Sequence, residues 1–324
     1  MAESNIEWVR GEDGMRGKVW NPITGCSKVS AGCKFCYAER VANRLKAIGV
    51  KGYEDTIDEN GNWTGKLQLL ESKLLEPLRW RKSRCIFVNS MSDLFHANVP
   101  DEWTDRVFAV MALCPQHTFL VLTKRAKRQC AYLGDLDYRR KRWACELERP
   151  EFKKFGPHTT IWFLTDHAAE PLQNVWLGVS VEDQPTADER IPWLLQTQAA
   201  RRFVSYEPAL GAVRIRKNWV VARSKCETCR STGYYGDLGP GRKRNNEYCP
   251  CDQCSDGAII DWLICGGESG PGARPMDLDW ARSVRDQCEK AGVAFFMKQV
   301  DKKRAIPEDL MTREFPKGAK HGCA

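Results

Sequence analysis

The sequence predicts an α/β fold, a partial TIM-type (β/α) barrel that carries a cysteine-rich insertion. Short apolar runs, several rich in β-branched or aromatic residues, alternate with longer stretches suited to helices. Polar or charged residues follow each run directly. The 324 residues are 42% hydrophobic and 28% charged, an ordinary globular composition that excludes wholesale disorder and a coiled-coil rod.

Seven apolar runs are the candidate strands. Their shortness suits buried parallel strands, although periodicity alone does not separate such strands from buried helix. They lie around Val19 and at Cys85–Asn89, Thr118–Leu122, Val175–Val179, Arg202–Ser205, Asp261–Cys265 and Val293–Met297.

Candidate helices lie between these runs, at Tyr37–Ile48, Asp101–Cys114, Thr186–Leu195 and Asp279–Ala291. Asp101 and Asp279 are expected as N-caps, and Gly292 as the residue that ends the last helix. On this plan residues 1–133 form the first half of the barrel, 172–221 continue it and 259–315 complete it. Residues 134–171 are expected to be a charged insertion, 222–258 a zinc-binding insertion, and 316–324 a mobile tail.

Fifteen cysteines are many for a chain expected in the cytoplasm. That expectation follows because the N-terminus lacks an apolar signal core and no apolar run approaches the roughly 20 residues of a membrane span. In a reducing compartment, clustered cysteines indicate metal ligands before disulfides. A net charge of +8 is compatible with a nucleic-acid partner without requiring one.

The first cysteine cluster, Cys26, Cys33 and Cys36, has no fourth cysteine nearby. Structural zinc sites normally close with four ligands, whereas three thiolates suit a 4Fe–4S cluster with one open iron. The pattern is similar to that of radical SAM enzymes, with Phe35 in their aromatic position, but the first gap is six residues instead of three. A zinc knuckle with a remote fourth ligand is the alternative.

The second cluster is a strong zinc signature, because two C-x2-C pairs flank a Gly-rich, basic loop. A second Fe–S cluster is the alternative. The expected zinc ligands are Cys226, Cys229, Cys251 and Cys254, with Cys249 spare.

In (β/α) barrels the active site lies at the carboxyl ends of the strands. Polar loops are common, so one polar strand end says little, but seven that meet at one mouth indicate a site. The candidates for substrate contact or proton transfer are Tyr206, Glu207, Lys124, Arg125 and Lys298.

Six segments together resemble one family of phage and prophage proteins of unknown function, named for a three-cysteine motif. They are WNPITGCSKVSAGCKFCYAER, VNSMSDLFHANVP, FLVLTKRAKR, VWLGVSVEDQ, FVSYEPALG and ICGGESGPGARPMD. That family resembles a divergent, spore photoproduct lyase-like branch of the radical SAM superfamily. The resemblance implies a partial barrel, a 4Fe–4S cluster and S-adenosylmethionine (SAM), but no substrate.

The resemblance also implies where SAM binds. Radical SAM enzymes often hold its amino group with a Gly-Gly-Glu-like motif after the second strand. Here NSMSD stands there, and Gly266, Gly267 and Glu268 follow the sixth run. Ser90, Ser92 and Asp93 are therefore assigned to the SAM amino group, and Ser180 and Glu182 to the ribose. The glycines would let backbone approach adenine or substrate, or simply form a tight turn.

The expected reaction is reductive cleavage of SAM to a 5′-deoxyadenosyl radical, with a flavodoxin- or ferredoxin-type electron donor. Basic clusters beside Trp or Tyr favour DNA, RNA or a nucleotide as substrate, although each cluster alone suits a solvated helix face. The competing class is a non-catalytic, zinc-dependent nucleic-acid-binding protein. A zinc hydrolase is disfavoured, because the five histidines form no recognisable ligand pair.

Overall fold

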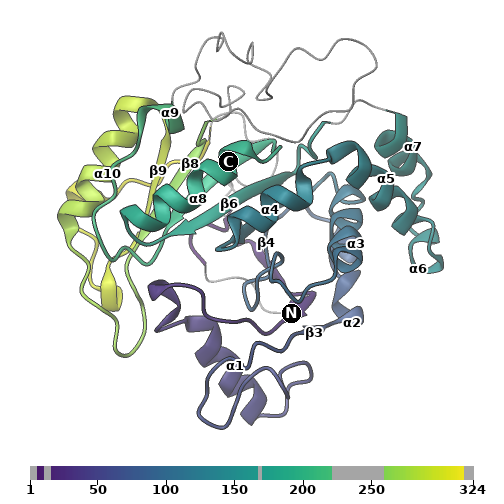
Figure 1. The fold of residues 1–324 in the computed structure, drawn as a ribbon, viewed down its shortest axis with the longest axis horizontal. Helices are drawn as coiled ribbons and strands as arrows, with labels where there is room; N and C mark the ends of the chain where they lie inside the picture. Colours follow the sequence, from purple (N-terminus) through teal and green to yellow (C-terminus); the bar gives the residue numbers. More distant parts are fainter. Residues whose placement is uncertain (1–5, 11–15, 167–169, 221–258, 317–324) are drawn as a thin grey trace.

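The computed structural model describes residues 6–10, 16–166, 170–220 and 259–316. The expected zinc ligands and almost all of the expected mobile tail lie outside these residues. The chain folds as a curled half-barrel of parallel strands with helices on its outer face (Figure 1). No helix among the described residues has the length and apolar character needed to cross a membrane.

Seven strands form the sheet, and each pairs in parallel with the strand before it. All seven predicted strands are confirmed, with ends shifted by a residue or two. In sheet order they are β1 (Lys18–Trp20), β4 (Cys85–Val88), β5 (Thr118–Thr123), β6 (Val175–Val181), β7 (Arg201–Tyr206), β8 (Trp262–Gly266) and β9 (Ala294–Gln299).

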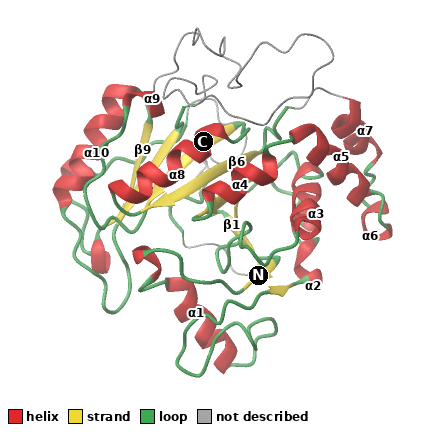
Figure 2. Ribbon diagram, in the orientation of Figure 1, coloured by secondary structure: helices red, strands yellow, loops and turns green. Residues whose placement is uncertain are grey.

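The main helices are α3 (Asp101–Ala112), α4 (Ala126–Leu133), α8 (Gln184–Gln196) and α10 (Leu278–Ala291), on one face of the sheet (Figure 2). The predicted N-caps are wrong by one and two residues. Pro100 occupies the cap of α3, and Asp277 caps α10 by accepting the Asp279 N–H at 2.9 Å. Gly292 does end α10, in the left-handed conformation (φ 69°) that glycine adopts without strain. Shorter helices are α2 (Glu71–Leu74) and α9 (Lys217–Val220), with 3₁₀ turns η2 (Pro77–Arg79), η3 (Asp301–Lys303) and η4 (Glu308–Leu310).

The charged insertion is helical. It contains α5 (Leu136–Leu147), α6 (Pro150–Lys153) and α7 (His158–Asp166). Its charges point inward as well as outward. Arg140, only 1% exposed, donates to the carbonyls of Phe163 at 2.5 Å and Glu170 at 2.6 Å. Polar groups of the insertion thus satisfy its own backbone.

The two faces of the sheet carry different cores. Toward the helices, the strands contribute mostly aliphatic side chains such as Val88, Val121 and Leu177. On the opposite face, strand residues two apart form a second, aromatic cluster around Trp262. Trp8 and Val9 fill this inner face, and the Trp8 ring lies 5.0 Å from that of Phe87. Residues 6–10 therefore pack inside the half-barrel, below its mouth.

A small subdomain lies beside the carboxyl ends of the strands. Strands β2 (Ile23–Thr24) and β3 (Gln68–Leu69) pair antiparallel, and η1 (Ala31–Cys33) and α1 (Tyr37–Ala47) follow β2. Buried residues of α1 pack with the chain that follows it and with Met91. The members of this third core are Ala38, Ala42, Tyr53, Ile57 and Met91.

Candidate functional site

Strand alternation places one set of polar residues over the aromatic floor. Side chains two apart in a strand share a face. Leu120 and Trp176 lie on the inner face, so Lys124, Ser180 and Glu182 follow them there in register. By the same count from Phe203 and Phe296, Glu207 and Lys298 complete the inner rim.

Cys26, Cys33 and Cys36 lie on the segment that runs from β2 to α1, which we call the cysteine loop (residues 25–36). Its first residue, Gly25, has φ 92°, and a Cβ there would overlap the Lys66 carbonyl oxygen. Only glycine fits such a position. The antiparallel β2–β3 pair thus fixes where the loop begins, and α1 fixes where it ends.

The first anchor of the loop is Arg125 at the end of β5. Its guanidinium donates to Asp93 at 2.8 Å and to the Ser27 hydroxyl at 2.9 Å. The same group lies 4.0 Å from the Cys26 sulfur. Asp93 also accepts from the Thr123 hydroxyl at 2.7 Å, so a buried carboxylate orients the arginine that holds the loop.

His96 supports this anchor from the other side. Its Nδ1 accepts the Asn98 N–H at 3.1 Å, and its Nε2 lies 2.8 Å from the Ser27 hydroxyl. Burial and the charge of Arg125 lower the pKa of His96 to about 4. The imidazole is therefore neutral near pH 7, and Nε2 carries the proton given to Ser27.

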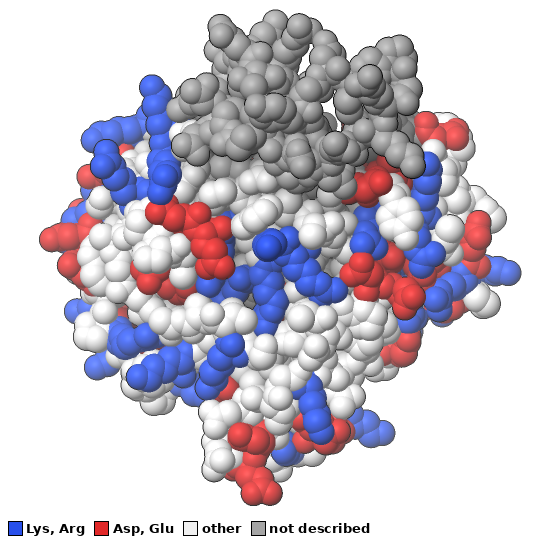
Figure 3. Space-filling view, viewed as in Figure 1, with Lys and Arg blue, Asp and Glu red and all other residues white. Residues whose placement is uncertain are grey.

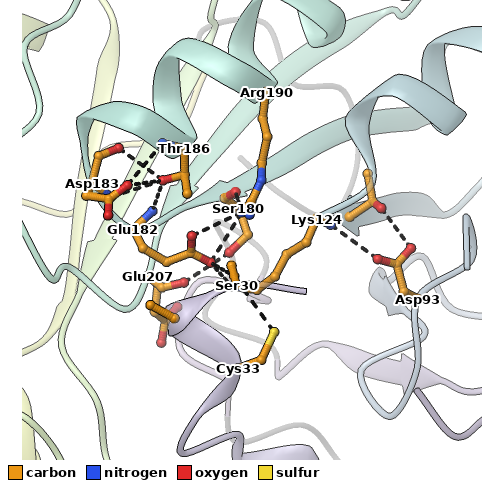
Figure 4. Close-up of polar contacts among 12 residues, drawn as sticks. Ser30, Cys33, Asp93, Lys124, Ser180, Glu182, Asp183, Thr186, Arg190 and Glu207 are labelled. Atoms are coloured by element: carbon orange, nitrogen blue, oxygen red, sulfur yellow. Dashed lines mark hydrogen bonds and ion pairs between the residues drawn. The ribbon is translucent and has the colours of Figure 1, made fainter. Parts of the chain in front are cut away.

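The second anchor is Glu182, just beyond β6 (Figure 4). Its side chain is fully buried and pairs with Lys124, and with Arg190 of α8 at 3.2 Å. The Ser30 hydroxyl of the cysteine loop donates to the same carboxylate at 2.8 Å. Burial opposes ionisation, but Lys124 and Arg190 outweigh it and hold the pKa of Glu182 below its usual value.

Gly32 gives the loop its close approach to this pair. A Cβ at Gly32 would lie 2.6 Å from Glu182 Oε1 and 2.8 Å from Lys124 Nζ. Such distances are well inside van der Waals contact. The glycine lets the loop backbone rest directly on the ion pair.

The third anchor is Arg274, in the segment after β8. It pairs with Glu268 and donates to the Ala31 carbonyl at 2.9 Å. Its guanidinium carbon also lies 5.4 Å from the centre of the Phe35 ring. The predicted aromatic residue of the cysteine motif is thus fixed by contact with a cation.

Glu207 and Lys298 form a separate pair on the rim, contributed by β7 and β9. Both side chains are partly accessible, at 19% and 18% exposure. Ser180 donates at 3.0 Å to the Glu207 carbonyl and so ties β6 to the turn after β7. This pair is the candidate for proton transfer that remains open to the mouth.

The other predicted residues have structural partners. The Ser92 hydroxyl donates to the Ile23 carbonyl at 3.0 Å, and that of Ser90 to Asn21 at 3.3 Å. Gly267 packs against the backbone of Asp301, and a Cβ added at Gly267 would lie 2.6 Å from the Asp301 nitrogen. A Cβ at Gly266 would make only ordinary van der Waals contacts.

Tyr206 is fully buried and belongs to the core under the helices. Its hydroxyl donates to the Gly211 carbonyl. The structure does not place it with Glu207 at the mouth.

Several residues of the site were not predicted. Ser27, Ser30, Arg190 and Arg274 hold the cysteine loop. All but Arg190 lie in the segments that carry the family resemblance, but nothing in those segments indicates that they contact the loop. Asn89 directly follows β4, with φ 58° and 3% exposure, and both polar atoms of its side-chain amide lack a hydrogen-bond partner in the described part of the chain. An amide buried without a partner is costly, so Asn89 is a candidate to meet a ligand.

The three thiols suit a thiolate-bound metal centre by their chemistry. All three are free and partly accessible. Burial raises the pKa of Cys26 to about 12, so the thiolate needs a compensating positive charge beyond that of Arg125. Within the described ranges, no three Cys, His, Asp or Glu side chains are grouped to hold one metal ion. The ligands of an Fe–S cluster bind different irons and need no such grouping.

A family model described as "Protein of unknown function (DUF5131)" matches residues 3–316. The chain belongs to this family. The match spans the cysteine loop, all seven strands and the polar residues at their carboxyl ends, so DUF5131 describes the whole half-barrel and its candidate site. No curated protein and no solved structure matches the chain.

Proposed function

We propose that the protein is a radical SAM enzyme that modifies or repairs nucleic acid or a nucleotide. Cys26, Cys33 and Cys36 would hold a 4Fe–4S cluster, and its open iron would bind SAM. The observation that carries this proposal is the placement of three free thiols on one anchored loop, at the carboxyl ends of seven parallel strands. When bound, the cluster would supply the electron that cleaves SAM reductively.

In this proposal, residues of the barrel hold the three cysteine ligands in place. Arg125 places positive charge beside the Cys26 sulfur and fixes the first ligand through Ser27. Glu182 and Arg274 hold the loop near Cys33, through Ser30 and Ala31. These anchors tie the cysteine loop to the carboxyl ends of the strands, so the ligands are preorganised and the reacting centre keeps one position.

Glu207 and Lys298 would bind or protonate the substrate at the opposite rim. The pair is accessible enough to exchange protons with solvent. The strands that contribute it, β7 and β9, lie on either side of β8 in the sheet. The aromatic cluster around Trp262 forms the dry floor of the mouth. Exclusion of water from below protects a reactive intermediate from side reactions.

The test is anaerobic reconstitution with iron and sulfide, followed by metal counting and EPR of the dithionite-reduced protein with and without SAM. We expect about four irons per chain and an EPR signal that SAM alters. A variant with Cys26, Cys33 and Cys36 all changed to Ala is the control and should lose both. Zinc at the cysteine loop without a SAM-sensitive signal would contradict the proposal and favour a non-catalytic nucleic-acid-binding protein.

A further inference from the structure

The exposed face of α1 carries a row of cations without acidic partners. Tyr37, Arg40 and Arg44 are spaced three and four residues apart, so they share one side of the helix. Lys34 lies one turn earlier, at the end of the cysteine loop. All four side chains are exposed. We call them the α1 basic face.

The charge of this face is not neutralised within the described structure. None of Lys34, Arg40 and Arg44 forms an ion pair with a described carboxylate. The one acidic residue of the helix, Glu39, points the other way, where it accepts the Trp63 N–H at 2.8 Å and pairs with Lys28. The helix therefore separates its acidic side from its basic side.

The cations at the mouth behave differently. Lys124, Arg125 and Arg274 each pair with a carboxylate of the barrel. Elsewhere the basic residues are mixed: Arg139 pairs with Asp101 at 2.5 Å and Arg140 is buried, whereas Arg79, Arg81 and Lys82 are exposed and belong to no ion pair among the described residues. In Figure 3 acidic and basic side chains lie side by side at the left and right edges of the molecule, whereas basic side chains gather across the centre of the view. The α1 basic face is thus distinguished by its position: its cations lack acidic partners and lie next to the cysteine loop, where Lys124, Arg125 and Arg274 are all paired.

Two further contacts shape this face. The Tyr37 hydroxyl donates to the Ser90 carbonyl at 2.9 Å, which fixes an aromatic ring that remains 44% exposed. The Arg40 guanidinium lies directly against Gly270, in the segment after β8, where a Cβ would overlap it. Arg40 therefore spans from α1 to the barrel rim, beside the cysteine loop.

We propose that the α1 basic face binds the backbone of a single-stranded nucleic acid and directs it toward the cysteine loop. This inference rests on the proposed function and narrows its substrate class. Uncompensated cations beside a fixed, exposed aromatic ring are the groups that bind phosphates and stack on unpaired bases. Arg40 and Arg44 are one helical turn apart, about 6 Å of rise, which suits contacts to neighbouring phosphates.

An acidic electron-donor protein is the other partner that such charge would attract. The fixed Tyr37 ring favours nucleic acid, because stacking on an unpaired base needs an exposed, immobile aromatic face. Charge attraction alone would give no role to that ring. The two partners therefore differ in their dependence on Tyr37.

The test is fluorescence anisotropy of fluorescein-labelled 20-nucleotide single-stranded DNA and RNA, titrated with the full-length protein at several salt concentrations. The variant Lys34→Ala/Arg40→Ala/Arg44→Ala should lower the slope of log K against log salt by about 2, at roughly 0.7 per phosphate contact. At 0.1 M salt this corresponds to about a 100-fold loss of affinity. The matched control, Lys82→Ala/Lys153→Ala/Lys290→Ala, removes the same charge from exposed sites elsewhere and should change affinity less than about threefold.

Two tyrosine variants separate stacking from charge. Tyr37→Phe keeps the ring and loses only the hydrogen bond that fixes it, so it should bind less than about twofold more weakly than the wild type, whereas Tyr37→Leu should bind at least about fivefold more weakly. Equal affinities of Tyr37→Phe and Tyr37→Leu would overturn the inference. Equal losses of affinity in the α1 triple variant and the triple-lysine control would also overturn it. Absence of oligonucleotide binding by the wild-type protein, with binding of an acidic flavodoxin instead, would also overturn it.

The EPR experiment on reconstituted protein is independent of these titrations. A SAM-sensitive EPR signal without oligonucleotide binding would refute only the inference about the α1 basic face and leave the enzymatic proposal standing. Oligonucleotide binding through the α1 basic face without such a signal would refute the enzymatic proposal alone.

Discussion

Replacing Glu182 with Gln is expected to destabilise the protein by about 3 kcal/mol. The Glu182 side chain is fully buried, and Arg190, which it neutralises, is 3% exposed. Leaving one member of a buried ion pair without its partner costs roughly 3–5 kcal/mol. The low end applies because the amide oxygen can still accept one hydrogen bond, and because Lys124, at 20% exposure, can turn to solvent.

Urea unfolding at pH 7 under reducing conditions measures this effect. With an m-value of about 3 kcal/mol/M, a loss of 3 kcal/mol lowers the midpoint by about 1 M. The matched control is Glu207→Gln, because Glu207 and Lys298 are both partly exposed. Solvent screens that pair, so its loss should cost less than about 1 kcal/mol. Equal midpoints for the two variants would refute the claim that Glu182 holds a buried cation.

The pH dependence of folding stability in acid gives a second check on Glu182. Its folded-state pKa lies below the unfolded value, so the unfolded state binds the proton more readily. The stabilisation is therefore present above the unfolded pKa of about 4.5 and is lost as the pH falls through the folded pKa. Stability of the wild-type protein should fall more steeply in acid than that of Glu182→Gln.

Three further changes test the anchors of the cysteine loop. Gly32→Ala should cost about 1–3 kcal/mol in urea unfolding and lower iron uptake, whereas Gly266→Ala, with ordinary space for a Cβ, should leave stability unchanged. Arg125→Lys cannot span its two partners as a guanidinium does and should reduce iron bound per chain without preventing folding, and a full complement of iron would count against the anchor. The folded-state pKa of His96, about 4, lies below the unfolded value near 6.5, so the wild-type protein loses stability as the pH falls from 6.5 toward 4. His96→Gln should therefore lose about 1–2 kcal/mol less stability than the wild type between pH 7 and pH 5. An equal loss in the two proteins would exclude a buried neutral His96.

Strand positions could be predicted from the sequence because parallel strands are short, apolar runs with polar ends. Alternation could have gone further. Tyr206 and Glu207 are consecutive, so a strand must send them to opposite faces. Counting by twos from Phe203, an inner residue, assigns Glu207 to the mouth and Tyr206 to the core. Tyr206 and Glu207 therefore cannot both face the mouth.

The contacts that anchor the loop could not be predicted, because they join residues far apart in the chain. Ser30 and Glu182 are 152 positions apart, and Arg274 and Ala31 are 243 apart. No local propensity encodes such a contact. The predicted N-cap of α10 was wrong for a local reason. Asp277 and Asp279 are both acidic and lie two residues apart, and only the backbone geometry decides which of them caps the helix.

The distribution of partners indicates which polar groups of the mouth remain available to a ligand. Asp93, Glu182 and Glu268 each accept from an arginine of the protein itself, and each of these pairs holds the cysteine loop. Their first task is therefore structural, and a ligand would have to displace an ion pair to use them. The Asn89 amide has no partner among the described residues, and the Glu207–Lys298 pair is partly open to solvent. Because an unpaired buried amide and an accessible ion pair are the groups that gain most from new partners, the polar contacts to cofactor and substrate are expected at Asn89, Glu207 and Lys298.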